Sequence, residues 1–371
     1  MKKYNGNKNI FFGIVLRFAL GVLLCVCAVF PQSGAAKAEE FCFTVFARGK
    51  TYRFYYPQLH IVSGELALSD TEGIVNSIYL DTLLSPRDAT MTFAPGGKDR
   101  FLFESEKDGE CIDENDLKKR IEYALLAGKS AVYAKTVVLK PEVTVASLKK
   151  QTVLRASFST SYCSSSVGRK HNVALAAKSV SGTVLMPGEI FSFNDTVGLR
   201  TAERGYKAAP VILDGEFTEG VGGGVCQVST TLYNAALRAG LCVTESHRHS
   251  VAVGYVAPSF DAMVSDNACD LRFKNVTDRN VYIEVLADGN TLTANVYGLK
   301  RTREYRAVSV VNEIVRAAEK RVSKDSGLKP TKKKDGLKSS GYLYVLCGDK
   351  IERVVLLRED FYKPIDGVIV E

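Results

Sequence analysis

Residues 220–234 read GVGGGVCQVSTTLYN, and this stretch decides how the middle of the chain folds. Its run of three glycines ends at Gly224 and permits a tight turn and a close approach of the backbone to a bound group. From Val225 onward apolar residues recur at helical spacing until Gly240. The stretch therefore predicts a loop without side chains, followed at once by a helix over 225–239.

Cys226 would lie in the first turn of this helix, where unpaired amide groups point outward and the helix dipole is positive. Such a position lowers the pKa of a thiol and offers hydrogen-bond donors to an oxyanion. Gln227, Ser229 and Thr230 add side-chain donors nearby. The pattern is typical of a cysteine nucleophile for acyl transfer.

A nucleophilic cysteine needs a base, and two of the four histidines follow closely in TESHRHSVAVGYV. A strand predicted over 250–257 would direct His249 toward the start of the helix. His247 has the same parity and would point the same way. The orienting partner of the base would then come from one of three polar residues: Asp261, Asp270 and Asn275.

Three other interpretations of Cys226 stay open at this stage. A cysteine in an apolar helix often serves as a small core residue. A disulfide with Cys242 or Cys269 would remove the nucleophile. A zinc site has no support, because the chain lacks C-x-x-C or H-x-x-x-H spacing, so we predict no metal and no cofactor.

The N-terminus resembles a secretory signal peptide over residues 1–38. Lys2, Lys3 and Lys8 precede an uncharged apolar run over 18–30, and Ala-Lys-Ala at 36–38 is a cleavage site of the A-x-A type. The run is short for a membrane span. We therefore expect export to the outer face of the cell envelope; an uncleaved segment, the alternative, would anchor the protein at the membrane.

The composition is that of a globular protein, with 371 residues, 46% hydrophobic and 24% charged. Removal of residues 1–38 lowers the net charge from +8 to +3, so attraction to anionic wall polymers is weak. Export and the lack of a basic patch with aromatics exclude nucleic acid as a partner. Seven cysteines follow residue 38, so at least one thiol stays free or pairs between chains. The oligomeric state is not predicted.

The periodicity predicts an α+β fold. A helix is expected over 113–127, and the central domain has two main helices, over 169–181 and 225–239. Mixed or antiparallel strands are expected over 182–193, 208–213, 250–257, 269–275, 280–287 and 291–297. The C-terminal part is expected to hold a turn or short helix within 301–328, a basic loop over 329–338 and a short β ribbon around Gly348-Asp349.

Residues from about 155 to 300 resemble the VanW family, which is named after a protein of glycopeptide-resistance clusters. The resemblance rests on several stretches in family order, among them ASFSTSY, GRKHNVALAAKSVSGTVLMPGEIFSFNDTVG, GYKAAPVI, GGGVCQVSTTLYNAALRAG, RHSVAVGYV and DLRFKN. The resemblance implies four segments: a signal peptide (1–38), a peptidoglycan-binding α+β module (39–150), a VanW-like domain (151–300) and a C-terminal β extension (301–371).

The resemblance also implies a function, since some family members are linked to L,D-transpeptidation with the cysteine as nucleophile. On this chain that cysteine is Cys226 and the matching base is His249, with main-chain amides near Gly224 for the oxyanion. The substrate would be a peptidoglycan stem peptide. Other positions match the family motifs without an assigned role: Arg169, Asn172, Asn194, Gln227, Tyr255, Asp261 and Asp270.

Two points of the resemblance stay open. Arg169 suits a carboxylate of a stem peptide, and equally an ordinary salt bridge at a helix start. Cys163 stands where the family is not expected to have a cysteine, and a Cys163–Cys226 disulfide would contradict catalysis. Three functions therefore remain: a cysteine acyl transferase, a peptidoglycan- or precursor-binding protein without catalysis, and a scaffold in a resistance or sporulation complex.

Overall fold

The computed structural model describes residues 42–55, 58–62, 65–213, 216–266, 268–323 and 330–371, so the expected signal peptide lies outside the described residues. Contacts divide the chain into two compact units, Met1–Ile78 with Glu114–Ala134, and Tyr79–Asp113 with Lys135–Glu371. The expected boundary at residue 150 comes from sequence resemblance and stays a prediction. Within the described chain, no helix has both the length and the apolar character that a bilayer crossing requires.

The first unit is a small sheet covered by a helix. Strand β1 (Phe43–Ala47) pairs antiparallel with β2 (Lys50–Phe54) and parallel with β8 (Ala131–Tyr133). Helix α2 (Glu114–Leu126) confirms the expected helix, and its residues at i, i+4, i+7 and i+8 are the buried ones. The unit also contains β3 (Leu59–Val62), β4 (Glu65–Leu68) and most of α1 (Thr71–Thr82).

The second unit begins with elements that precede the central domain in sequence. They are β5 (Thr90–Phe93), β6 (Phe101–Glu104), β7 (Gly109–Ile112), β9 (Thr136–Leu139) and α3 (Val145–Lys149). The β5–β6 hairpin packs on the central domain, because Phe93 and Phe101 make edge contacts with Tyr282 at 5.4 and 5.2 Å between ring centroids.

The core of the second unit is an antiparallel sheet with two helices packed on it. Its strand order is β10-β18-β17-β11, with bounds Val153–Ser161, Thr291–Gly298, Val281–Ala287 and Val184–Leu185. Helix α4 (Val167–Val180) packs on β17, and α6 (Val225–Ala239) packs on β10 and β18. Both helices match the sequence prediction, and Gly240 at φ +76° ends α6.

Smaller elements surround this sheet. A second sheet has the order β12-β16-β15, with bounds Ile190–Ser192, Arg272–Lys274 and Cys242–Glu245. The short helix α5 (Phe193–Val197) follows β12, and β13 (Ala208–Leu213) and β14 (Glu216–Val221) form a hairpin just before α6. The strand expected over 182–193 is thus two short strands, β11 and β12, separated by the turn at Gly188 (φ +81°).

The strand expected over 250–257 is wrong. These residues form an irregular loop with no ladder partner, although their pattern alternates. The C-terminal extension holds the loop instead: Lys363 donates its amide hydrogen to the Ser250 carbonyl at 2.8 Å, and Lys334 Nζ donates to the Ala252 carbonyl at 2.5 Å. The parity argument for His247 and His249 therefore fails, and their side chains point in directions that the loop sets.

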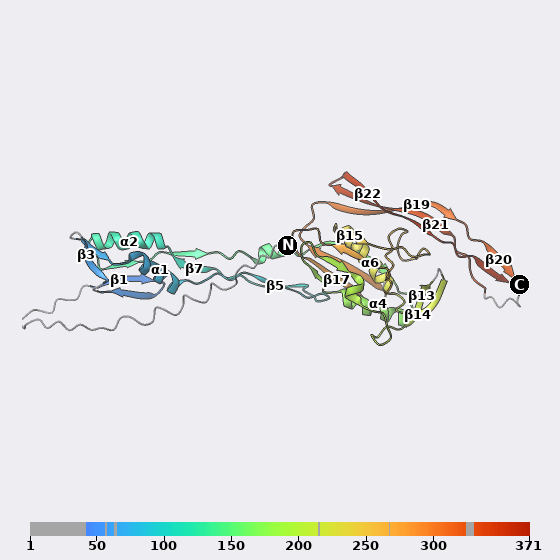
Figure 1. Cartoon of the computed structure of the whole chain (residues 1–371), viewed down its shortest axis with the longest axis horizontal. Coiled ribbons are helices and arrows are strands. Elements are labelled where there is room, and N and C mark those ends of the chain that lie inside the picture. Colours follow the sequence, from blue (N-terminus) through green and yellow to red (C-terminus); the bar gives the residue numbers. More distant parts are fainter. Residues whose placement is uncertain (1–41, 56–57, 63–64, 214–215, 267, 324–329) are drawn as a thin grey trace, which may run out of the picture. The chain divides into compact units, whose positions relative to one another are not determined.

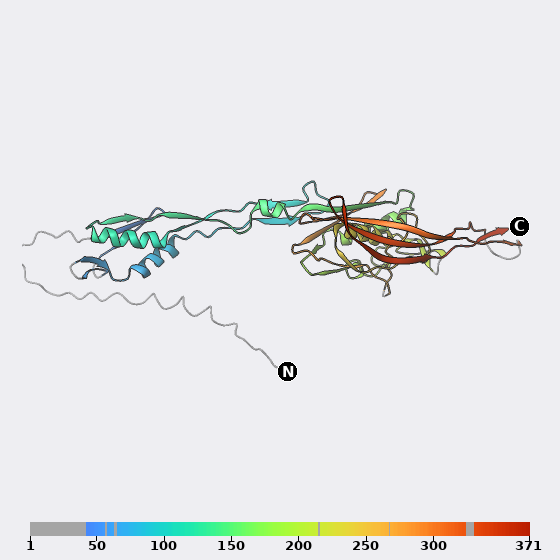
Figure 2. The same ribbon diagram turned by 90° about the horizontal axis from the view of Figure 1, so that it is seen from above.

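The C-terminal extension is larger than the expected ribbon. The ribbon around Gly348 is confirmed as β21 (Gly336–Cys347) and β22 (Lys350–Tyr362), but β21 also pairs with β19 (Glu304–Val315). A parallel pair, β20 (Glu319–Val322) and β23 (Gly367–Val370), completes it. The described part of 301–328 contains no short helix, because β19 and β20 occupy most of it and β19 is a Val-rich strand whose partner lies far along the chain; residues 316–318 connect the two strands, and 324–328 lie outside the described residues. Figures 1 and 2 show β19, β21 and β22 running side by side in orange and red. The fold is α+β, as predicted.

Candidate active site

The glycine loop brings strand β14, helix α4 and the start of helix α6 into close contact. Gly222 and Gly224 have φ of +89° and +106°, a region that side chains rarely adopt. A Cβ on Gly223 would lie 2.6 Å from the Pro210 carbonyl oxygen, and one on Gly224 would lie 3.0 Å from the Cγ of Arg169. Larger residues would push this loop away from α4 and shift the first turn of α6.

Cys226 lies in the first turn of α6, as predicted. Gly224 caps the helix without a side-chain hydrogen bond, and within the described chain the amide nitrogen of Cys226 has no hydrogen-bond partner. The half-buried thiol lies 3.3 Å from the Val264 carbonyl oxygen. The first turn thus keeps a free amide donor beside the sulfur, which is the requirement for an oxyanion site.

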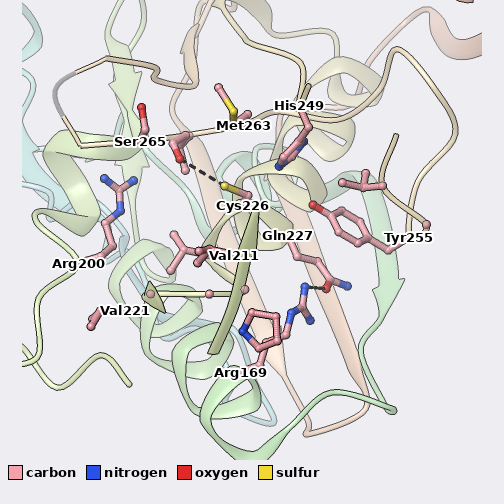
Figure 3. A pocket seen from close by; sticks show the side chains of 18 of the residues that line it. Arg169, Arg200, Val211, Val221, Cys226, Gln227, His249, Tyr255, Met263 and Ser265 are labelled. Atoms are coloured by element: carbon pink, nitrogen blue, oxygen red, sulfur yellow. Dashed lines mark hydrogen bonds between the residues drawn. The ribbon is translucent and has the colours of Figure 1, made fainter. Parts of the chain in front are cut away.

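The His249 ring lies beside the Cys226 thiol (Figure 3). His249 Nδ1 bonds to Asp261 Oδ2 at 2.7 Å, and the His249 amide donates to the same oxygen at 2.6 Å. Because Nδ1 is engaged by Asp261, Nε2 is the ring nitrogen that is available to the Cys226 thiol. His249 is 4% exposed and Asp261 is 1% exposed, so water does not weaken their contact. The thiol, imidazole and carboxylate thus lie in a row, in the same contact arrangement as the nucleophile, base and acid of acyl-transfer triads.

The charges of the triad support one another. Burial alone would raise the pKa of the Cys226 thiol, but the hydrogen bond and positive charge of His249 outweigh it and lower that pKa. Burial alone would lower the pKa of His249, but Asp261 and Cys226 raise it to about 9. The pKa of Asp261 is lowered despite burial, by His249 and Arg358. These directions favour the charged form of the triad, with a thiolate, an imidazolium and a carboxylate.

The polar side chains of α6 hold the segment that carries Asp261. Ser229 Oγ donates to the Ala262 carbonyl at 2.5 Å, and Asn234 Nδ2 donates to the Phe260 carbonyl at 2.7 Å. Thr230 Oγ1 accepts from the Ala262 amide at 2.9 Å. Ser229 and Thr230 are completely buried, so they position this segment and do not supply the oxyanion donors that we expected of them.

A pocket of about 430 Å³ opens over Cys226. Its lining residues come from the glycine loop, the β13–β14 hairpin, the loop after His249 and the 263–266 segment; Figure 3 labels Arg169, Arg200, Val211, Val221, Cys226, Gln227, His249, Tyr255, Met263 and Ser265. This volume is within the range of small-molecule and peptide sites. Cys226 and His249 therefore line a cavity of a size that suits a small ligand.

Arg169 is the arginine of this pocket that has no acidic partner in the described chain, whereas Arg200 pairs with Asp266 and Lys334 Nζ donates to the Ala252 carbonyl. Its guanidinium donates to Ser165 Oγ and Gln227 Oε1, both at 2.8 Å. The side chain of Gln227 is fixed by two further hydrogen bonds, which Nε2 donates to Thr160 Oγ1 and the Ser161 carbonyl at 2.9 Å each. Its side-chain amide is therefore not available as a donor to an oxyanion. The salt bridge at the helix start that the sequence allowed is not formed, and Arg169 remains open to an anionic ligand.

Four of the sequence candidates support the architecture and do not contact the thiol. Asn172 joins the Lys207 and Gly223 backbones, and Asn194 Nδ2 donates to the Ser265 and Cys269 carbonyls. Asp270 accepts from Ser192 Oγ at 2.6 Å and from the Asn194 amide at 2.9 Å. Asn275 donates to the Leu185 and Arg279 carbonyls. Of the three expected orienting residues, only Asp261 contacts the His249 ring.

His247 and Tyr255, two further sequence candidates, lie in different places: His247 lies away from the thiol, and Tyr255 lies in the pocket wall. His247 Nε2 bonds to Glu245 at 2.9 Å, so its ring faces the second sheet and not Cys226. Tyr255 lines the pocket beside Gln227 and Cys226 (Figure 3), and burial and the nearby Cys226 raise the pKa of its hydroxyl. Tyr255 is therefore a neutral hydrogen-bonding group of the pocket wall.

The disulfide alternatives are wrong for this structure, because all seven cysteines of the described chain are free, including Cys163, Cys242 and Cys269. The described residues contain no group of three or more His, Cys, Asp or Glu side chains arranged for a metal ion.

The sequence analysis missed residues of the C-terminal extension that reach the triad. Arg358 Nη2 donates to Asp261 Oδ1 at 2.6 Å, and Tyr362 donates its hydroxyl hydrogen to the same oxygen at 2.5 Å. Arg358, Asp360 and Tyr362 occupy alternate positions of β22, so a buried polar face of that strand was visible in the sequence. Lys334 of the basic loop, which we took for a solvated loop, lines the pocket.

Comparison with known proteins identifies the central part of the second unit. The family model described as VanW like protein matches residues 168–297, which include Cys226, His249 and Asp261. The chain contains a VanW-like domain. The "Uncharacterized protein YoaR" of Bacillus subtilis is 45% identical over 138 residues, which are 37% of this chain and 46% of that protein. The "Vancomycin B-type resistance protein VanW" of Enterococcus faecalis is 31% identical over 136 residues, 35% of this chain and 49% of that protein.

The chain thus spans about half the length of the curated relatives that it matches. One solved structure, described as "Crystal structure of HP0197-G5", is 25% identical over 19% of this chain and 95% of its own, with a TM-score of 0.11. A TM-score this low supports no argument about the fold. The VanW-like domain holds all three members of the triad, whereas Arg358 and Tyr362 lie outside the matched range.

Proposed function

We propose that this chain is an exported cell-envelope protein whose VanW-like domain performs cysteine-dependent acyl transfer on peptidoglycan stem peptides. The observation that carries the proposal is the Cys226 thiol, held beside a His249–Asp261 pair at the base of an open pocket. A cysteine that only fills a hydrophobic core does not require a buried histidine beside it, whereas here Asp261 and Cys226 raise the pKa of such a histidine to about 9. Buried groups with shifted pKa values are typical of active sites. The printed name of one relative, a vancomycin resistance protein, favours a wall-related substrate.

In the first step the Cys226 thiolate attacks the carbonyl carbon of the residue before the terminal D-residue of a tetrapeptide stem. A carbon–sulfur bond forms, the carbon–nitrogen bond breaks, and the leaving amine takes a proton from the His249 imidazolium. The amide of Cys226 donates to the oxyanion. In the second step an amine of a neighbouring stem attacks the thioester, His249 takes its proton, and the thiolate leaves; water in place of the amine gives carboxypeptidation.

Arg169 gives the pocket a preference for anionic peptides. Its guanidinium has no carboxylate partner in the described chain, is held by Gln227 next to Cys226, and has its pKa lowered by burial. A buried cation without a partner gains most from a carboxylate that replaces its lost hydration. A free carboxylate of the stem peptide is therefore the group that we expect beside Arg169.

The localisation and the role of residues 39–150 belong to the same proposal. A signal peptide over 1–38 would deliver the protein to the outer face of the envelope, where stem peptides are found. The module over 39–150 would bind the wall and bring the VanW-like domain to its substrate. Secretion is tested by fractionating cells and determining the N-terminal residue of the mature protein.

The test of the chemistry uses the purified protein and disaccharide tetrapeptide fragments. We expect mass spectrometry to detect an acyl adduct on the peptide that contains Cys226, together with release of the terminal residue. Cys226→Ala should reduce turnover by roughly 10⁴-fold or more. Cys163→Ala is the matched control, because Cys163 is exposed and also has a lowered pKa, through Ser161, but lies outside the pocket lining.

A binding protein without catalysis is the second candidate, and the pocket with its unpaired Arg169 is the observation that favours it. This candidate predicts that Cys226→Ala still binds tetrapeptide fragments with wild-type affinity and that the wild type forms no adduct. Absence of both the adduct and terminal-residue release from the wild type would overturn the acyl-transfer proposal.

A further inference from the structure

The C-terminal extension contacts the triad through two side chains of one strand. Arg358 and Tyr362 lie four positions apart on β22, and both donate to Asp261 Oδ1, at 2.6 and 2.5 Å. Arg358 also donates to the Asp261 backbone carbonyl at 2.7 Å. Since His249 uses only Oδ2, the two oxygens of Asp261 have separate tasks. Oδ2 contacts His249, and Oδ1 accepts hydrogen bonds from Arg358 and Tyr362 of the extension.

The strand geometry directs these side chains at Asp261. The register of β21 and β22 shifts between Gly341 and Tyr342, next to the pair Gly341–Arg358, and such a bulge turns the following side chains. Gly341 allows close approach, because a Cβ there would lie 3.0 Å from the Cβ of Ser259. The sheet of the extension thus packs directly on the segment before Asp261.

Ser259 shows that this segment is held in a strained form. Its φ is +65°, which a residue with a side chain rarely adopts, and it is completely buried. The extension stabilises it: the Ser259 amide donates to the Tyr362 hydroxyl oxygen at 2.9 Å, and Ser259 Oγ bonds to Ser339 Oγ at 2.7 Å. The Tyr362 hydroxyl therefore accepts a hydrogen bond from the Ser259 amide and donates one to the Asp261 carboxylate.

We infer that Arg358 and Tyr362 are positioning residues of the active site, which keep Asp261 ionised and oriented toward His249, so that the VanW-like domain needs the C-terminal extension for its chemistry. This inference rests on the proposed function. The charge of Arg358 keeps the shared proton on His249, because a carboxylate that already accepts two hydrogen bonds on Oδ1 has a low affinity for a further proton. The groups that face Asp261 are His249, Arg358 and Tyr362 and, at longer range, Tyr233 and Tyr255; Asp360 pairs with Arg358 at 2.7 Å.

The experiment measures the alkylation rate of Cys226 by iodoacetamide from pH 4 to 10, read on the Cys226 peptide by mass spectrometry. In the wild type the rate should rise with an inflection below the ordinary thiol range. Arg358→Met raises the pKa of Asp261 and removes a positive charge, so we expect this inflection to move up by at least about one pH unit. Tyr362→Phe should move it in the same direction by less, since it removes a neutral donor.

The controls separate positioning from a general loss of structure. Arg303→Met and Tyr344→Phe change the same two residue types on the same extension, where Arg303 pairs only with exposed Glu352. Arg358→Lys keeps the charge and should retain most of the wild-type inflection. A purely structural role would lower the folded fraction, seen by circular dichroism, and would add a population alkylated with the pH dependence of an ordinary exposed thiol, so only variants that remain folded are compared.

Two results would overturn the inference. If Arg358→Met and Tyr362→Phe are folded and keep the wild-type inflection, the extension does not act on the triad, while the proposed function stands. If wild-type Cys226 itself is alkylated with the pH dependence of exposed Cys347, the thiolate is absent and the proposed function fails with the inference.

Discussion

Asp261 and Glu284 are two buried carboxylates in nearly the same setting. Each receives hydrogen bonds from an arginine and a tyrosine: Arg358 and Tyr362 for Asp261, and Arg100 and Tyr297 for Glu284. Each arginine comes from a segment outside the family match, the extension in one case and the stretch just before β6 in the other. Burial would raise the pKa of both carboxyls, but hydrogen bonds and charges lower both: His249 and then Arg358 for Asp261, and the Gly96 amide and then Arg100 for Glu284.

The remaining partners of the two carboxylates differ. Glu284 completes its shell with the Asn295 amide group and the Gly96 backbone amide, at 2.8 Å each. Asp261 completes its shell with His249, which lies beside Cys226 and the pocket. A buried carboxylate held by arginine and tyrosine is thus a way of attaching a segment to this domain. It becomes part of the candidate active site only where it also holds an imidazole beside a thiol.

The largest expected contrast is in turnover. If the proposed acyl transfer is correct, Asp261→Asn should reduce release of the terminal residue by roughly 10⁴-fold, because His249 loses its orientation and its charge partner, as in serine proteases that lack the triad aspartate. Glu284→Gln should change turnover by less than about threefold, since the groups that it contacts are remote from the pocket lining. Equal losses in the two variants would show that the carboxylates have the same role.

The next contrast is in the free energy of unfolding, measured by urea denaturation. Asp261→Asn removes one of the two carboxylates that pair with the buried Arg358, since Asp360 remains at 2.7 Å, and it also removes the charge partner of His249. It should destabilise the second unit by about 3 kcal/mol. Glu284→Gln should destabilise it by roughly 1–2 kcal/mol, because Arg100 is 38% exposed and keeps contact with water, whereas Arg358 is 13% exposed. A larger loss in Glu284→Gln would contradict this ranking.

The smallest contrast is in the titration of His249, followed by the NMR resonances of its ring. The imidazolium should lose its proton at about pH 9 in the wild type and in Glu284→Gln. In Asp261→Asn the hydrogen bond and negative charge that raise this pKa are gone, so the midpoint should move down toward 6.5 by at least about one unit. A midpoint near 6.5 in the wild type would contradict the charge distribution of the triad.

The sequence predicted the parts of the site that depend on local patterns. The glycine loop, the helix over 225–239 and the position of Cys226 in its first turn all follow from neighbouring residues, and the structure confirms each of them. The choice of His249 came from nearness along the chain and from the resemblance, although the strand offered as its reason was wrong.

The parts that were missed depend on contacts between distant segments. Arg358 lies 97 positions from Asp261 in the sequence. The alternation of polar residues along a strand does not specify which distant residue those side chains will contact. Ser229 and Thr230 were expected to face the substrate, but they bind the backbone of the 260–264 segment, whose path is itself fixed by the extension. The extension was therefore both the least predictable region and the one that completes the surroundings of Asp261.

Central to this account is the claim that Cys226 is a thiolate at neutral pH. The direct measurement is the thiolate absorbance near 240 nm, taken as the difference between the wild type and Cys226→Ala from pH 4 to 10. The account predicts that the difference develops at a lower pH than the thiolate absorbance of an ordinary cysteine, because His249 lowers the pKa of this thiol. A difference that develops only above about pH 8, in the range of an ordinary cysteine, would contradict it.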